Sequence, residues 1–80
     1  MSFIEVIRKR IKEIMKERNL TQYKLSEMTG VPQSTLSCFF NDNSRLGFKI
    51  TTLYEICSGL NIEFRDFFKP EYMNLENIED

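Results

Sequence analysis

One segment constrains this chain more than any other part of it: Gln22 to Asn41, with the sequence QYKLSEMTGVPQSTLSCFFN. Its apolar residues fall where two short crossed helices would touch, and polar residues fill the other positions. Thr21 is a good N-cap for the first helix, and Gly30 can take the positive φ that a tight turn needs. Pro32 suits the start of the second helix. The segment therefore predicts two short helices joined by a glycine turn.

A longer helix is predicted before this segment. Ser2 and Glu5 form a capping-box pattern, in which the serine hydroxyl and the carboxylate each accept from the other residue's amide. Isoleucines then recur at spacings of three, four and three residues: Ile4, Ile7, Ile11 and Ile14. This pattern indicates one apolar stripe on a helix of about four turns, and Asn19 can take the left-handed conformation that ends it.

Two further helices are predicted after a turn cluster and loop that occupy residues 41–47. The first extends over about 50–60, and the second, over about 63–68, stops before Pro70. The last ten residues, 71–80, are acidic but carry several large apolar side chains. The chain is therefore predicted to be all-α, a single domain of five short helices around one small core.

Composition limits the classes of protein to which this chain can belong. Its 80 residues are 41% hydrophobic and 29% charged, and no apolar run approaches the roughly 20 residues that cross a bilayer. It has no histidine and only two cysteines, Cys38 and Cys57, so no metal, cofactor or disulfide framework is expected. We expect a cytoplasmic protein with reduced thiols, with Cys57 in the core and Cys38 exposed. One exposed thiol is only weak evidence of a redox sensor.

Two short helices joined by a glycine turn are typical of a helix-turn-helix, which places its second helix in the DNA major groove. The net charge of −1 is unusual for a DNA-binding protein, but the charge is unevenly distributed. Residues 1–49 carry nine Lys/Arg and five Asp/Glu, whereas residues 50–80 carry two and seven. The basic half can face phosphates while the acidic half faces away; the alternative is that both halves are ordinary solvated surface.

These residues resemble those of the Cro/phage-repressor (XRE) type of helix-turn-helix family. The resemblance covers residues 3–68 and rests on five groups: Leu20-Thr21-Gln22, Leu25-Ser26, Gly30-Val31, Ser34-Thr35-Leu36-Ser37, and Leu53 through Ile62. It implies a compact, lambda-repressor-like domain, here residues 1–70, that binds operator DNA, usually as a two-fold dimer. Double-stranded DNA and a second copy of the chain are then the expected partners.

Three positions depart from the family pattern. Ser26 stands where alanine is preferred, so its hydroxyl needs a partner if it is buried, and Asp42 stands where glycine is common. The resemblance places Met15 and Phe40 at the positions of an arginine and a glutamate that often form an ion pair. We predict that these two apolar side chains pack against each other; the alternative is an exposed Phe40 that contacts a partner.

The outer face of the second helix in the segment carries the expected base contacts. Gln33, Ser34, Ser37 and Cys38 share this face by helical spacing. Gln33 is the best reader, because its amide can form a bidentate pair with adenine N7 and N6. The serines specify weakly, and Cys38 offers a small apolar contact to a thymine methyl. The alternative is a plain solvent-facing surface, although serine is not a strong helix former.

Contacts to DNA phosphates are expected at the ends of the helix pair. Thr21 and Gln22 lie at a predicted helix N-terminus, whose free amides suit an anion, and Gln22 can also steady Gln33. The resemblance implies that the loop after the second helix touches the DNA backbone as well. The full expected set is Thr21, Gln22, Thr35, Asn41, Ser44, Arg45 and Lys49.

The C-terminal part has more aromatic residues than so small a core needs. We expect this surplus to form a self-complementary dimer interface with the last helix and the acidic tail, residues 71–80. The expected interface residues are Phe64, Phe68, Tyr72 and Met73. The alternative is that these residues close the bottom of the core and leave the tail frayed.

Two classes of function follow. The first is a sequence-specific transcriptional regulator, a repressor that binds a palindromic operator as a dimer. The second is a protein-interaction module on the same fold, such as an antitoxin or anti-repressor, which the acidic tail and the aromatic residues suit. A protein partner that modulates DNA binding fits the first class as well. Catalysis is not expected, because the sequence has no histidine, phosphate-binding glycine loop or convergent carboxylate pair.

Overall fold

The computed structural model describes residues 1–41 and 48–79, and all regular structure within them is helical. The described residues form α1 (Phe3–Glu17), α2 (Gln22–Thr29), α3 (Gln33–Asn41), α4 (Ile50–Leu60) and α5 (Phe64–Phe67), followed by the 3₁₀ turns η1 (Glu71–Met73) and η2 (Leu75–Asn77). The predicted all-α domain of five helices is confirmed. The fifth helix is one residue shorter at each end than predicted, because Glu63 and Phe68 are its caps. No helix in these ranges is long and apolar enough to cross a membrane.

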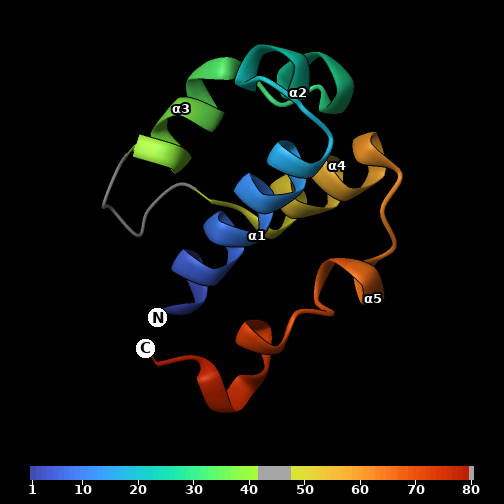
Figure 1. Cartoon of the computed structure of the whole chain (residues 1–80). Coiled ribbons are helices and arrows are strands. Elements are labelled where there is room, and N and C mark those ends of the chain that lie inside the picture. Colours follow the sequence, from blue (N-terminus) through green and yellow to red (C-terminus); the bar gives the residue numbers. More distant parts are fainter. Residues whose placement is uncertain (42–47, 80) are drawn as a thin grey trace.

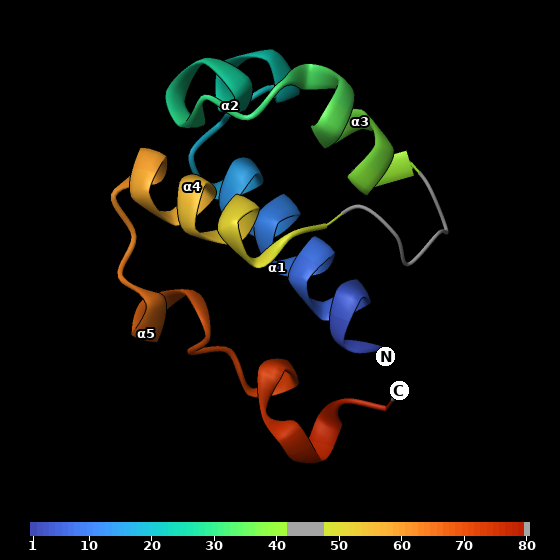
Figure 2. The same cartoon turned by 180° about the vertical axis from the view of Figure 1, so that it is seen from behind.

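The helices are arranged with α1 and α4 in the middle of the molecule (Figures 1 and 2). In both views α2 and α3 lie across one end, and α5 with the tail lies at the other. The core between them is built from buried apolar side chains of α1 to α5 and of η1. The helix pair predicted from the sequence is therefore a layer at one end of the molecule, open to a partner.

The local signals in α1 form as predicted. The Glu5 amide donates to the Ser2 hydroxyl at 3.3 Å, and the Ser2 amide donates to the Glu5 carboxylate at 3.2 Å, which completes the capping box. These hydrogen bonds to Ser2 lower the pKa of the Glu5 carboxyl. Ile7, Ile11 and Ile14 are buried with Val6, so the isoleucine stripe is the inner face of the helix.

Gly59 lets α2 rest directly on α4. A Cβ atom at this position would lie 2.5 Å from the Met28 carbonyl oxygen and 2.6 Å from the Thr29 Cα. Both are backbone atoms at the end of α2, so no side-chain rotation could relieve the clash. The sequence alone does not show which helix Gly59 contacts, although a glycine inside an apolar helix often marks a close approach.

Two arginines of α1 and its C-cap residue, Arg18, donate to backbone carbonyls in the last turns of three other helices. Arg8 Nε donates to the Phe39 carbonyl of α3 at 2.7 Å, Arg10 Nε to the Phe67 carbonyl of α5 at 2.7 Å, and Arg18 to the Leu60 carbonyl of α4 at 2.6 Å. The last carbonyls of a helix have no partner within the helix, and they form the negative end of its dipole. The arginines therefore tie α1 to the ends of α3, α4 and α5.

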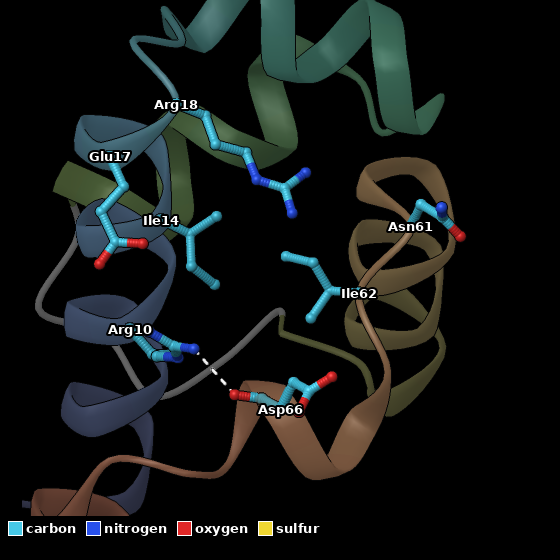
Figure 3. A pocket seen from close by; sticks show the side chains of 7 residues that line it. All are labelled: Arg10, Ile14, Glu17, Arg18, Asn61, Ile62 and Asp66. Atoms are coloured by element: carbon cyan, nitrogen blue, oxygen red, sulfur yellow. Dashed lines mark hydrogen bonds between the residues drawn. The ribbon is translucent and has the colours of Figure 1, made fainter.

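Figure 3 shows two of these arginines in a cleft of about 170 Å³ between α1 and the start of α5. Arg10 also donates to the Asp66 carbonyl at 2.8 Å and forms an ion pair with Glu13 at 2.7 Å. All three nitrogens of the Arg10 guanidinium are thus engaged within the protein. The cleft therefore serves the fold, and we assign it no ligand.

The acidic tail is folded onto α1 rather than frayed. The Tyr72 hydroxyl donates to the Glu13 carboxylate at 3.1 Å, and Lys9 Nζ lies 4.1 Å from the centre of the Tyr72 ring. Met73 is buried, with 6% of its surface exposed, and the Glu79 amide donates to the Met1 carbonyl at 2.8 Å. Residues 71–79 therefore complete the core at the end of the molecule opposite α2 and α3 (Figure 1).

Candidate nucleic-acid interface

The turn between α2 and α3 is held by local hydrogen bonds. The Thr21 hydroxyl accepts from the Lys24 amide at 3.1 Å, which confirms the predicted N-cap of α2. Gly30 has φ of 77°, and its amide donates to the Ser26 carbonyl. The Ser26 hydroxyl, which needed a partner, donates to the Val31 carbonyl at 2.6 Å. The relative placement of the two helices is therefore fixed by the backbone of the turn.

One face of α3 is fully occupied by packing. Leu36 has no exposed surface and Phe39 is 8% exposed. The Phe39 ring stacks on Phe48 at a centroid distance of 4.2 Å and lies 5.2 Å from the Arg8 guanidinium. Because these contacts fix the rotation of α3 about its axis, the opposite face must point away from the core.

The outward face of α3 carries the four predicted base contacts. Gln33, Ser34 and Cys38 are exposed, and Ser37 is half-buried. The Ser37 hydroxyl accepts from the Asn41 side-chain amide at 3.3 Å, one turn further along the same face. In Figure 1 this helix forms an outer edge of the molecule. The surface is thus small, polar and uncharged, with Gln33 as its longest side chain.

The start of α2 lies beside the start of α3. Gln22 Nε2 donates to the Gln33 backbone carbonyl at 3.4 Å, which links the two helix starts, while support of the Gln33 side chain stays a prediction. Thr21 is exposed and Gln22 half-buried at this corner. Thr35, the third residue of α3, is also half-buried. The N-terminal ends of α2 and α3 therefore lie together, beside the free backbone amides of the first turn of α2.

A family model for the Cro/C1-type HTH DNA-binding domain matches residues 10–72. The chain belongs to this family. The match begins within α1, includes α2 to α5 and extends into η1. No curated protein and no solved structure gives a significant match. Because the Cro/C1-type domain is a DNA-binding domain and not an enzyme, the membership supports DNA binding through the α2–α3 pair.

The end of α3 in this Cro/C1-type domain is anchored by apolar packing. Phe40 and Met15 are both half-buried and pack against the core. The Phe40 ring lies 5.4 Å from the Phe39 ring and 5.8 Å from Lys12 Nζ of α1. These contacts favour the packed Phe40 over the exposed one, while direct contact between Met15 and Phe40 stays a prediction.

Two of the remaining predicted phosphate contacts of the Cro/C1-type domain, Asn41 and Lys49, lie near the end of α3. Asn41 is exposed at the last position of α3, and Lys49 is exposed at the N-cap position of α4. Ser44 and Arg45, like Asp42, lie outside the described residues. Arg8 and Lys12 of α1, which were not among the predicted contacts, lie at the same end of α3. Both belong to the basic residues on the polar side of α1, and this pattern is the sequence feature that could have drawn attention to them.

The two cysteines occupy different environments in the Cro/C1-type domain. Cys57 is 2% exposed in the core, as predicted, and burial raises the pKa of its thiol. Cys38 is exposed on the outward face of α3. The chain therefore carries one accessible thiol in the middle of its candidate DNA-reading surface.

Proposed function

We propose that this protein is a sequence-specific transcriptional repressor that binds a palindromic operator as a dimer. The observation that carries the proposal is the outward face of α3. Its small polar side chains are presented by a helix whose other face is fully buried, in a family defined by DNA binding. Such a helix can enter the major groove without a large or charged side chain in its way.

Gln33 is the principal base reader in this proposal. Its exposed amide can form the bidentate pair with adenine, which discriminates against other bases by roughly 1–3 kcal/mol. Ser34 and Ser37 supply adaptable hydroxyls, and Cys38 makes an apolar contact to a thymine methyl. Because α3 carries no Lys or Arg, the commonest contact to guanine does not come from this helix.

Phosphate contacts on both sides of α3 would fix its register in the groove. At the start of α2, Thr21 and Gln22 present hydroxyl, amide and backbone donors beside the helix N-terminus. At the end of α3, Asn41 and Lys49 are exposed in the positions expected to meet the other strand. We include Thr35, Ser44 and Arg45 in the phosphate set on the basis of the sequence.

The dimer contact in this proposal lies at an apolar groove of about 660 Å³ between the N-terminal parts of α1 and α4 and the α5 segment. Its walls include Phe64, which is 51% exposed, Ile50 and Tyr54, which are 84% and 60% exposed, and Phe68. Tyr72 and Met73 contact α1 and the core of their own chain. We therefore centre the proposed interface on Phe64 and Phe68, and we keep Tyr72 and Met73 in it on the basis of the sequence alone.

Selection of binding sites from random duplexes, followed by mobility shifts across a salt series, tests this function. A repressor of this kind yields one enriched half-site in an inverted repeat, and its affinity for that site falls as salt rises. Gln33→Ala should relax preference at one base pair per half-site. The matched control Asn74→Ala, on the exposed tail, should leave the preference unchanged. Loss of affinity for all sequences alike in Gln33→Ala would contradict the assigned role.

A protein-interaction module on the same fold is the second candidate, because the open apolar groove could equally hold another protein. If the protein is such a module, no duplex should show a sequence-dependent mobility shift at any salt concentration. Sedimentation of wild type and Phe64→Ser separates the uses of the groove. A repressor dimer dissociates to monomers in the variant, whereas a module that captures other proteins is monomeric in both.

A further inference from the structure

Three lysines of α1 form a row on its exposed side. Lys9, Lys12 and Lys16 follow one another at spacings of three and four residues, so they share one helix face. All three are exposed. Lys9 and Lys12 also line, with Arg8, a shallow hollow of about 320 Å³ on the flank of the helix. The three lysines therefore form a row along the polar side of α1, which we call the α1 basic row.

Lys12 of the α1 basic row lies beside the C-terminal end of α3. Lys12 Nζ lies 5.8 Å from the centre of the Phe40 ring, and Arg8 donates to the Phe39 carbonyl. The next residue after Phe40 is Asn41, a proposed phosphate contact. When a helix lies in the major groove, the phosphate backbones form the walls at its two sides. A cation beside the end of α3 is thus close to one of these walls.

Two described carboxylates near the α1 basic row already accept hydrogen bonds within the protein. Glu5 lines the same hollow, where its carboxylate accepts from the Ser2 amide. Glu13 accepts from both Arg10 and the Tyr72 hydroxyl, on the side of α1 that faces the tail. Among the described residues that line the hollow, cationic side chains therefore outnumber carboxylates.

We propose that the α1 basic row is a second contact surface for the DNA backbone, which extends the footprint beyond the end of α3. The inference rests on the proposed DNA-binding function and adds residues that the sequence analysis did not assign. Lys9 to Lys16 spans roughly 10 Å along the helix, since each residue rises about 1.5 Å. One strand presents a phosphate about every 3.4 Å of duplex axis, so the row can meet two or three phosphates. These contacts carry no sequence information and act through charge.

Salt-dependent binding of the full chain tests the inference through Lys12→Gln, Lys16→Gln and the control Lys69→Gln. Lys9 is left unchanged because its Nζ also lies 4.1 Å from the centre of the Tyr72 ring in the tail. Lys69 directly follows the C-cap of α5, and α5 lies at the end of the molecule away from α3 (Figure 1). Each lysine that contacts a phosphate contributes about 0.9 to the slope of log affinity against log salt. We expect each α1 variant to lower the slope by about that amount on operator and random duplexes alike, whereas Lys69→Gln should leave it unchanged.

Acetylation of the wild-type protein, read by mass spectrometry, gives a second measurement that needs no substitution. Bound duplex should slow the modification of Lys9, Lys12 and Lys16 but not of Lys69. Unchanged slopes and unprotected α1 lysines in a protein that binds DNA would overturn this inference and leave the proposed function intact. A wild-type protein that shows no salt-dependent DNA binding would overturn both.

Discussion

Replacing Gly59 with alanine should separate α2 from α4 and destabilise the whole domain. The added Cβ would lie 2.5 Å from the Met28 carbonyl oxygen and 2.6 Å from the Thr29 Cα. Overpacking costs about 1–3 kcal/mol, and the upper end applies because the obstacle is backbone. Alanine regains about 1 kcal/mol of helix propensity, so the net loss should be about 2 kcal/mol. For a domain of this size the melting temperature should then fall by about 8–16 °C.

Thermal unfolding followed by circular dichroism measures this effect, with Ser58→Ala as the matched control. Ser58 is the exposed neighbour of Gly59 on α4, and its replacement should raise stability slightly, by about 0.5 kcal/mol or less. Because α2 is fixed to α3 by the turn, Gly59→Ala should also weaken DNA binding below the melting temperature. A melting temperature at or above that of the wild type would refute the close contact between α2 and α4.

Three further predictions concern the arginine contacts, the thiols and the tail. Arg10→Met should cost about 1.5–3 kcal/mol in urea unfolding, because charged hydrogen bonds to the end of α5 are lost, while Arg65→Met on the exposed side should cost little. Ellman's reagent should modify Cys38 in the folded protein but Cys57 only on unfolding; equal rates would contradict the buried position of Cys57. Burial, with the charge of Glu13 and the hydrogen bond to it, raises the pKa of Tyr72 to about 12. The raised folded-state pKa means that the protonated hydroxyl stabilises the fold fully below about pH 10, and that this contribution is lost as the pH rises through about 12. Tyrosinate absorbance should show the late titration, and Tyr72→Phe should remove it.

Helix boundaries could be predicted from the sequence because the signals are local. The capping box at Ser2, the N-cap at Thr21 and the left-handed residues Asn19, Gly30 and Asn61 all act within a few residues of their own position. The apolar periodicity also gave the inward face of α3, and with it the four outward residues. A prediction of this kind needs only the geometry of one helix.

The contacts that hold the helices together could not be predicted in the same way. Arg8, Arg10 and Arg18 donate to backbone carbonyls, which every residue possesses, so no partner is visible in the sequence. The packing partner of the tail could not be predicted from the sequence for a related reason. Whether Tyr72 and Met73 pack within the chain or against a second copy depends on distant residues of α1, which composition alone does not identify.

The accessibility of Cys38 with DNA bound tests the central claim most directly, because this thiol lies in the middle of the proposed reading face of α3. The measurement is the rate at which a small alkylating reagent modifies Cys38, with and without the duplex selected by the protein. If α3 reads the major groove, the bound duplex should slow the reaction, and prior labelling of Cys38 with a bulky group should abolish specific binding. A duplex that binds tightly while Cys38 reacts at the rate of the free protein would contradict this claim.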